Sequence, residues 1–455
     1  MVNAQSAHAA GVQRLLESYR AVPATAPIRL AKSTSNLFRT RVQAQAQGLD
    51  PSGLTGVIAV DVAARTADVA GMCTYDVLVA ATLRHGLAPL VVPQLKTITL
   101  GGAVTGLGIE STSFRNGLPH ESVLEMDILT GAGEIITASP GQNTDLFRAF
   151  PNSYGTLGYA VRLRIELEPV KPFVALTHVR FHSLVDLVAA LDGILETGRL
   201  DGVFVDYLDG VVFSADESYL CVGRQTSAPG PASDYTGQQI YYRSIQHDRN
   251  ATDDRLTIHD YLWRWDTDWF WCSEAFGAQH PLIRRVWPGR YRRSSFYGKL
   301  MKLEQRFLIG DRIEKLNGRL PRERVVQDVE VPIARCAEFL DWFLNNIPIE
   351  PIWLCPLRLR GDDHWPLYPI RPQQNYVNVG FWSTVPVGSS DGATNRLIER
   401  KVSELDGHKS LYSDSYYSRP EFDELYGGDS YRAAKKRYDP DSRLLDLYSK
   451  AVLRR

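Results

Sequence analysis

Residues 93–117, PQLKTITLGGAVTGLGIESTSFRNG, are the stretch of sequence that decides the fold. They hold five glycines among threonine, serine and small apolar residues, and they follow a short apolar run at 87–92. Glycine lets the backbone approach a ligand closely, and successive backbone N–H groups in such a loop attract anionic groups. The spacing matches neither a Walker loop nor the G-x-G-x-x-G fingerprint, and no helix is expected directly after it. Taken alone, the stretch fits either an ordinary turn or an anion-binding loop outside the Rossmann fold.

The overall composition is that of a globular protein with more than one domain. A chain of 455 residues exceeds what one core accommodates, and its net charge of −1 excludes the basic footprint of a nucleic-acid binder. Five scattered cysteines without a C-x-x-C motif suit a reducing cytosol, and no group of His, Asp and Glu has metal-ligand spacing. No signal peptide and no bilayer-spanning run is found. We therefore expect a cytoplasmic protein without a metal.

Hydrophobic periodicity divides the chain into three parts. In residues 1–170, short strands and helices close on glycine-rich turns, with strands expected at 56–62, 67–71, 122–129, 134–138 and 159–167 and a helix at 75–85. Residues 171–400 alternate between strands and helices. Strands are expected at 177–182, 325–331, 352–359 and 376–384, and helices at 184–197 and 334–345. This order predicts an α+β cap with an antiparallel sheet. Residues 401–455 predict helices, including 419–426 and 430–438.

With these elements placed, the chain resembles a known superfamily of flavoproteins. The segments TLGG (99–102), GLGIESTS (106–113), NTDLF (143–147) and GTLG (155–158) resemble the FAD-binding domain of the vanillyl-alcohol-oxidase/PCMH superfamily. Three later segments are similar to its sterol Δ24-reductase branch: VVQD (325–328), PIWLCP (351–356) and the tail 411–431. The resemblance implies an α+β fold with a two-subdomain PCMH-type FAD-binding domain over 1–170. It also implies an antiparallel cap over 171–400 and C-terminal helices in 401–455 that return to the FAD domain.

The resemblance also implies where FAD binds. The pyrophosphate is expected against two N-terminal loops, and the ribityl chain and flavin ring beside the later glycine turns. The implied cofactor-binding residues are Lys32, Ser33, Thr34, Ser35, Asn36, Thr97, Thr99, Leu100, Gly101, Gly102, Gly106, Ser111, Ser113, Gly155, Thr156 and Gly158. Many superfamily members tether FAD through a histidine in the first loop. Residues 32–36 contain neither His nor Cys, so we expect non-covalent FAD, with NADPH as its reductant.

Three side chains are candidates for proton transfer. Glu110 lies within the loop expected beside the flavin, where a desolvated carboxyl stays protonated and acts as a general acid. The alternative role is a structural hydrogen bond to loop amides. Tyr416 and Tyr417 lie on the tail that resembles the part of the family folding back towards the flavin. For these tyrosines, proton donation and simple packing both stay open.

One segment is unusually rich in aromatic residues. HDYLWRWDTDWFW (259–271) holds four of the nine tryptophans, and the basic run RRVWPGRYRR follows at 284–293. Amphipathic aromatic side chains favour the lipid headgroup level, and anionic lipid attracts arginine. The segment fits a lipid pocket, peripheral contact at the inner face of the cell membrane, or ordinary packing.

The resemblance implies FAD-dependent, NAD(P)H-driven reduction of an isolated carbon–carbon double bond in a lipid. Because no carbonyl polarises such an alkene, a proton must arrive as hydride is transferred, which calls for a poorly solvated acid and aromatic faces. We expect a methylene-branched fatty acyl chain of a phospholipid, reduced from 10-methylene to 10-methyl, with a Δ24 sterol side chain as the alternative. An FAD-dependent alcohol or sugar oxidase and a lipid-binding protein without activity are further alternatives.

Overall fold

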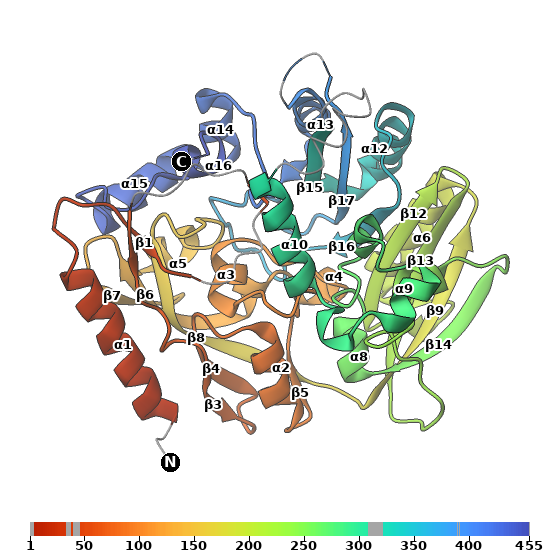
Figure 1. Ribbon diagram of the computed structural model, residues 1–455, viewed down its shortest axis with the longest axis horizontal. Helices are drawn as coiled ribbons and strands as arrows, with labels where there is room; N and C mark the ends of the chain where they lie inside the picture. The colour runs from red at the N-terminus through yellow and green to blue at the C-terminus, as the bar shows by residue number, and fades with distance from the viewer. Residues whose placement is uncertain are drawn as a thin grey trace.

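The computed structural model describes residues 4–32, 38–39, 46–307, 322–388, 390 and 392–454, with the backbone alone over 301–307. Two main sheets, one of six strands and one of eight, lie side by side with helices around them (Figure 1). The α+β fold class expected from the sequence is confirmed.

The N-terminal domain is built on the six-stranded sheet, in which β5 pairs with β8 beside the order β3-β4-β8-β6-β7. Its strands are β3 (Val57–Asp61), β4 (Thr66–Ala70), β5 (Leu87–Pro89), β6 (Val123–Thr130), β7 (Ile135–Ala138) and β8 (Gly158–Pro169). Around the sheet lie α1 (Ala4–Arg20), α2 (Tyr75–Leu83), α3 (Leu100–Thr105), α4 (Ser113–Asn116), η1 (Pro119–Ser122) and α5 (Thr144–Ala149). A separate parallel pair, β1 (Ile28–Leu30) with β2 (Gln47–Leu49), lies at one edge of the domain.

The glycine-rich stretch is not irregular throughout. Helix α3 begins at Leu100, and the N-cap Thr99 accepts a hydrogen bond from the Gly102 N–H at 3.1 Å. The stretch itself contains a short helix that the sequence did not predict, because the threonine cap and the small residues after it allow one to form. Glycine at position 101 is needed for packing: a Cβ there would lie 2.6 Å from the Gly71 carbonyl oxygen.

The cap contains an antiparallel eight-stranded sheet in the order β14-β9-β13-β12-β16-β17-β15-β18. Its strands are β9 (Phe173–Phe181), β12 (Tyr207–Ser214), β13 (Glu217–Thr226), β14 (Ala251–Thr257), β15 (Arg322–Pro332), β16 (Ile352–Leu357), β17 (Tyr376–Pro386) and β18 (His408–Lys409). A short pair, β10 (Arg199–Leu200) with β11 (Val203–Phe204), follows α6 (Leu184–Thr197). Helices α12 (Ile333–Asn346) and α13 (Ala393–Glu404) complete the cap. Because β18 pairs with β15, this sheet extends past residue 400, where we had expected the cap to end.

Successive side chains along each cap strand point to opposite sides, so the eight-stranded sheet has two different faces. One face packs with α6 and α12 in an aliphatic core that includes Val325, Val329 and Val379. Neighbouring residues on the same strands point the other way and line a cavity against the N-terminal domain; Asp328 and Trp382 are two of them. The register of this sheet therefore decides which side chains reach the cavity.

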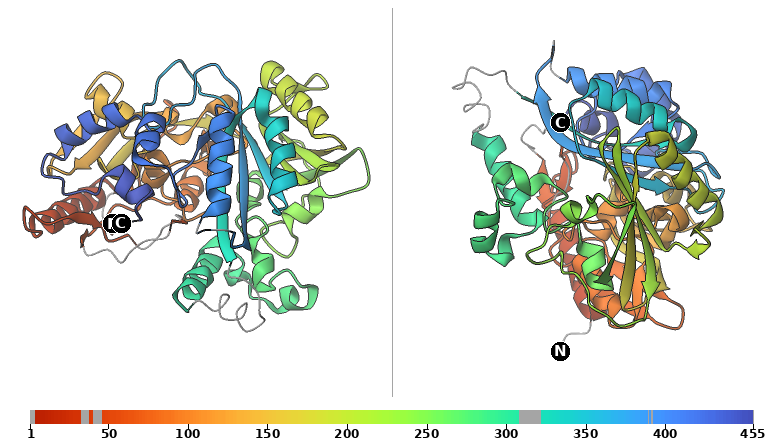
Figure 2. Two further views of the ribbon diagram at one scale, coloured as in Figure 1. Left: turned by 90° about the horizontal axis from the view of Figure 1, so that it is seen from above. Right: turned by 90° about the vertical axis from the view of Figure 1, so that its right-hand side faces the viewer.

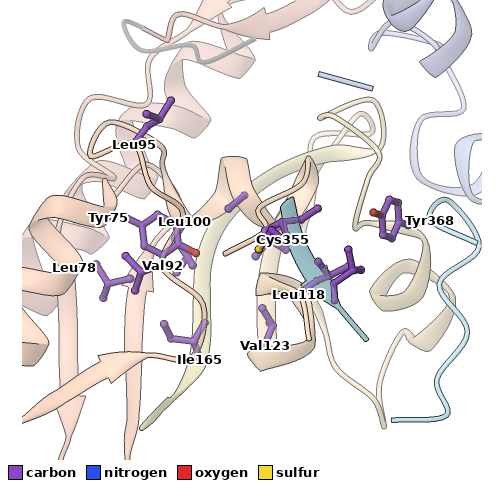
Figure 3. Close-up of a cluster of buried hydrophobic side chains, with 14 of the residues drawn as sticks. Tyr75, Leu78, Val92, Leu95, Leu100, Leu118, Val123, Ile165, Cys355 and Tyr368 are labelled. Carbon is purple, nitrogen blue, oxygen red and sulfur yellow. The ribbon is translucent and has the colours of Figure 1, made fainter. Parts of the chain in front are cut away.

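The two domains share a continuous hydrophobic core. Figure 3 shows Tyr75, Leu100 and Ile165 of the N-terminal domain in one cluster with Cys355 of β16, and all four belong to the same set of buried residues. This shared core holds the cap sheet against the N-terminal domain.

Apart from strand β14, residues 241–307 form a helical projection on one side of the cap, coloured green in Figure 2. Its elements are α7 (Tyr241–Ile245), α8 (Ile258–Trp263), η2 (Cys272–Phe276), α9 (Pro281–Val286), η3 (Gly289–Tyr291) and α10 (Ser294–Phe307). The four clustered tryptophans, Trp263, Trp265, Trp269 and Trp271, are at most 7% exposed. A membrane contact through these tryptophans is therefore ruled out, because their rings pack inside the protein.

The C-terminal helices α14 (Arg419–Leu425), α15 (Gly428–Tyr438) and α16 (Leu447–Ala451) return to the N-terminal domain, as the resemblance implies (Figure 1). Lys435 Nζ donates to the Thr156 carbonyl at 2.8 Å, and Tyr438 Oη donates to the Asp145 carboxylate at 2.9 Å. These contacts join α15 to the segment between β7 and β8.

Candidate functional site

A cavity of about 850 Å³ lies between the N-terminal domain and the cap. One end is bordered by glycines from two stretches of chain: Gly101, Gly102, Gly106, Gly155 and Gly158. The other end is bordered by aromatic side chains, mostly from the cap and its projection: Phe38, Trp269, Phe270, Trp353, Trp382 and Tyr412. The volume falls within the range of sites for cofactors and small ligands.

The glycine end carries ammonium groups. Lys32 Nζ donates to Thr99 Oγ1 at 3.2 Å, and a Cβ on Gly102 would lie 2.8 Å from that oxygen and 3.4 Å from the ammonium. Lys450 also lines the cavity, and its Nζ donates to the Tyr154 carbonyl at 2.6 Å. This end therefore offers positive charge and unobstructed backbone to an anionic group.

Seven of the predicted cofactor-binding residues line the cavity: Lys32, Thr99, Gly101, Gly102, Gly106, Gly155 and Gly158. Four others, Ser33, Thr34, Ser35 and Asn36, lie outside the described residues. The structure thus brings together glycines from loops more than 50 residues apart in the sequence.

The remaining five predicted residues, Thr97, Leu100, Ser111, Ser113 and Thr156, lie outside the lining. Leu100 is part of the hydrophobic core. The three buried hydroxyls take part in structural hydrogen bonds: Ser111 Oγ accepts from Tyr261, Ser113 Oγ accepts from the Glu110 N–H, and Thr156 donates to the Ser153 carbonyl. They shape the loops behind the cavity wall.

Glu110 belongs to a buried ion cluster behind that wall. Arg264 Nη2 lies 3.2 Å from Glu110 Oε1 and 2.8 Å from Asp209 Oδ2, and all three side chains are almost completely buried. Burial raises the pKa of Glu110 to about 7, against the opposing effect of Arg264 and with a further increase from Asp209. Its neighbour Ile109 lines the cavity, but Glu110 does not. The structure therefore does not bring Glu110 to the position of an acid at the flavin.

The same cluster supports the aromatic end of the cavity. Asp209 Oδ2 accepts hydrogen bonds from the indole N–H groups of Trp265, at 3.1 Å, and Trp353, at 3.2 Å. Because Trp353 lines the cavity, the cluster fixes one of its walls.

The predicted tail tyrosines also lie away from the cavity. The Tyr416 N–H donates to the Glu399 carboxylate at 3.2 Å, and the guanidinium of Arg396 lies 4.5 Å from the centre of the Tyr416 ring. Tyr417 is buried, with its ring centre 5.9 Å from that of Tyr426. The residue of this tail that does reach the cavity is Tyr412, which sequence reasoning missed.

Sequence reasoning also missed the acidic residue at the aromatic end, Asp328. Its carboxyl group hydrogen-bonds to the Tyr412 hydroxyl, and Oδ1 accepts from Asn378 Nδ2 at 3.0 Å. Burial raises the pKa of Asp328 to about 6, although Asn378 and Tyr412 both oppose the shift. Gly380 is its partner on β17, and a Cβ there would lie 2.5 Å from Asp328 Oδ1. Glycine at that position leaves room for the carboxyl group.

Aromatic rings enclose this acid. The ring of Phe270 lies 4.3 Å from that of Trp382 and 5.4 Å from that of Trp353, measured between centroids. Phe38 stacks on Trp269 at 5.5 Å and meets Tyr412 edge-on at 5.8 Å. Apart from Asp328, this end of the cavity is largely apolar, which suits a ring system or an apolar chain.

The described residues hold neither a metal-binding cluster nor a helix that could span a membrane. No group of three or more His, Cys, Asp or Glu side chains there has the arrangement needed for a metal ion. Likewise, none of the described helices combines the length and the apolar character needed to cross a bilayer.

Residues 7–139 match the model of a family described as FAD binding domain. The N-terminal domain is an FAD-binding domain. Over 378 residues, 79% of this chain and 69% of the relative, the sequence is 29% identical to a Delta(24)-sterol reductase of Rattus norvegicus. Over 417 residues it is 28% identical to the Homo sapiens Delta(24)-sterol reductase, covering 87% of this chain and 76% of the relative.

A shorter match of 131 residues is 33% identical to cytokinin dehydrogenase 9 of Oryza sativa subsp. japonica, and covers 29% of this chain and 24% of that protein. The chain is thus an FAD-dependent oxidoreductase that resembles sterol reductases over most of its length. This confirms the resemblance inferred from the glycine-rich loops.

Proposed function

We propose that this flavoprotein reduces an isolated carbon–carbon double bond of a lipid, with NADPH as the reductant of its FAD. The observation that carries the proposal is the cavity, which joins a glycine- and lysine-lined end to an aromatic end where the described residues supply one carboxyl group. An alignment that covers 87% of the chain includes most of the cap, so the resemblance to a Delta(24)-sterol reductase extends to the part that forms the aromatic end.

The residues present fit FAD. Lys32 and Lys450 would neutralise the pyrophosphate, while Gly101 and Gly102 allow it to approach the backbone. The aromatic end would hold the flavin ring and the apolar substrate and exclude water from both. When bound, FAD supplies two-electron transfer between a nicotinamide and a carbon atom.

For the substrate, the sterol reductases among the relatives favour a Δ24-type sterol side chain over the methylene-branched acyl chain expected above. Both alkenes have one fully substituted carbon, so both need a proton at the less substituted carbon. The same cavity chemistry serves either lipid, and the experiment must distinguish them.

Anaerobic flavin spectroscopy tests the proposal. NADPH should bleach the FAD absorbance of the loaded protein, and a Δ24-unsaturated sterol should restore it, whereas the saturated sterol should not. Restoration only by a phospholipid with a 10-methylene acyl chain would assign the acyl substrate instead. Failure of NADPH to reduce the flavin, together with reduction by an alcohol or a sugar, would refute the reductase proposal.

We also propose that the protein reaches its lipid by peripheral contact with an anionic membrane, through a surface on α9. Leu282 and Val286 are 74% and 77% exposed, and Ile283 beside them is also exposed. Three arginines near them are exposed as well. Arg285 lies on α9 itself, and Arg290 and Arg293 follow the helix in the sequence. We call these six residues the α9 surface.

Several observations support this choice of surface. Elsewhere in the described chain, exposed large apolar residues occur singly in the sequence or as one pair. Arg284 of the same helix turns inward to Asp268, so the outward arginines are a separate set. The projection that carries α9 also supplies Trp269 and Phe270 to the cavity. A lipid that enters from the bilayer would therefore be close to the aromatic end.

Vesicle co-sedimentation tests the α9 surface. The wild-type protein should bind vesicles that contain phosphatidylglycerol and leave pure phosphatidylcholine vesicles in the supernatant. The double variant Leu282→Asp/Val286→Asp should lose binding, while Val185→Asp, a change at an exposed valine on α6, should not. Equal binding by the double variant and the wild type would refute this surface.

A further inference from the structure

We infer that Asp328 is the acid that protonates the double bond, and that Tyr412 is the residue that positions it. The inference rests on the proposed reduction of an alkene and names a residue that neither the loops of the FAD-binding domain nor the predicted candidates include. Its basis is the placement of one carboxyl group among aromatic rings at the end of the cavity.

Among the described residues, Asp328 is the one carboxyl-bearing side chain in the lining. Glu110 lies behind the wall and is paired with Arg264. Glu330, two residues along β15, is completely buried outside the lining and accepts a hydrogen bond from Ser410 Oγ at 2.9 Å. Position therefore selects Asp328 over these other two buried carboxyls.

The hydrogen bonds around Asp328 suit a group that releases a proton. Trp382 Nε1 donates to Tyr412 Oη at 2.9 Å, which leaves the tyrosine hydroxyl proton to point to the carboxyl group. The Asn378 amide donates to Oδ1 at 3.0 Å. The carboxylate that forms when the proton leaves therefore accepts hydrogen bonds from Tyr412 and Asn378. Proton loss does not create a buried charge without hydrogen-bond donors.

The proposed step balances in atoms and electrons. The π electron pair of the alkene takes the proton from the Asp328 carboxyl, and a C–H bond forms at the less substituted carbon. The other carbon receives a hydride, so the alkene is reduced and the cofactor is oxidised. Asp328 is left as a carboxylate and regains a proton from water, and the net reaction consumes one NADPH and one proton. Positive charge that develops on the substituted carbon meets the ring faces of Trp353 and Trp382.

Half-reactions of the FAD-loaded protein separate this role from cofactor binding. In Asp328→Asn, reduction by NADPH should stay within about two-fold of wild type, while reoxidation by the lipid alkene should slow by about 100-fold or more. Asp253→Asn, on the edge strand β14 of the same sheet, is the matched control and should behave as wild type. Reoxidation of Asp328→Asn within about three-fold of wild type would overturn the inference.

An infrared titration reads the acid without turnover. The C=O stretch of a protonated carboxyl should titrate near pH 6 in the wild type and in Asp253→Asn, and should be missing in Asp328→Asn. In Tyr412→Phe the band should persist to higher pH, because one donor to the carboxylate is gone. Among the described residues, the other titratable groups that interact with Asp328 include Glu330, Tyr154, Tyr368 and Cys355. An unchanged band in Asp328→Asn would overturn the assignment.

The two readouts also separate the inference from the proposed function. If no lipid alkene reoxidises the wild-type flavin, the proposed function fails, and the infrared titration alone decides whether Asp328 is a protonated acid. If Asp328→Asn does not bind FAD, the infrared titration of Tyr412→Phe tests the inference instead. A carboxyl band that titrates at the wild-type pH in this variant would refute the role of the tyrosine in positioning the acid.

Discussion

Replacing Glu110 by Gln should make the folded protein less sensitive to pH without abolishing alkene reduction. Glu110 shares Arg264 with Asp209, so the cluster holds one cation for two carboxyl groups. The attraction of Arg264 and the hydrogen bonds from Ser111 do not offset the desolvation of the Glu110 carboxylate. An ionised Glu110 is therefore poorly compensated, whereas Gln is neutral and its amide oxygen retains the bond to Arg264.

The magnitude follows from the pKa of Glu110. Burial raises this pKa from 4.5 to about 7 in the folded state. A carboxyl group whose pKa is higher in the folded than in the unfolded state stabilises the folded state at pH values below its unfolded pKa. This stabilisation is lost as pH rises through 4.5 towards 7. The shift corresponds to an upper limit of about 3 kcal/mol. For a chain of this length unfolding as one unit, about 3 kcal/mol is about 3 °C in melting temperature.

The assay is thermal unfolding of wild type, Glu110→Gln and the surface control Glu134→Gln at pH values below 4.5, near 6 and above 7. The difference in melting temperature between Glu110→Gln and wild type should grow in favour of the variant as pH rises. The control, an exposed glutamate in the turn before β7, should show a constant difference. A difference for Glu110→Gln that does not change with pH would refute the description of this cluster. A large loss of alkene reduction with FAD bound would instead restore Glu110 as the acid.

Other changes give equally direct outcomes. Gly102→Val should weaken FAD binding about 10- to 100-fold in a fluorescence titration, because its side chain overpacks the corner between Thr99 and Lys32; Gly141→Ala, with open space around it, should have no effect. Lys32→Met should weaken FAD binding by about 10-fold at low salt, and the difference should shrink as salt screens the charge. Tyr416→Phe should leave alkene reduction within about two-fold of wild type, because its ring lies outside the cavity lining. The triple variant Arg285→Glu/Arg290→Glu/Arg293→Glu should bind anionic vesicles at least about 100-fold more weakly, at about 1 kcal/mol for each arginine removed.

The glycine end of the cavity was partly predictable from the sequence because its residues lie in short contiguous stretches. Glycines that serve a ligand can be recognised from their local spacing, and Gly101, Gly102, Gly106, Gly155 and Gly158 all line the cavity. The neighbouring hydroxyls were not predictable in the same way. Ser111 and Ser113 lie in the same stretch, but the backbone there orients both hydroxyls away from the cavity. Each accepts a hydrogen bond from a buried group instead.

The helices and strands were predicted well where the periodicity is strong. Helix α6 spans the predicted 184–197, and β15, α12 and β17 each lie within a few residues of the expected bounds. For the projection that contains α9, the sequence left a lipid pocket, membrane contact and ordinary packing open, because composition does not show which way side chains point. Its tryptophans are buried, and the exposed apolar residues are the less conspicuous Leu282, Ile283 and Val286.

The acid at the aromatic end could not be found from the sequence, because it depends on the register of the cap sheet. Asp328 pairs with Gly380 on β17, and its carbonyl accepts from the Ser410 N–H just after β18. That contact places the tail so that Tyr412, rather than Tyr416 or Tyr417, meets the carboxyl group. A slip of β15 by one residue would turn Asp328 into the aliphatic core and put Val329 in the cavity. Val325, Val329 and Val331, buried against the cap helices, therefore do more than stabilise the cap, because their burial keeps the carboxyl on the side that lines the cavity.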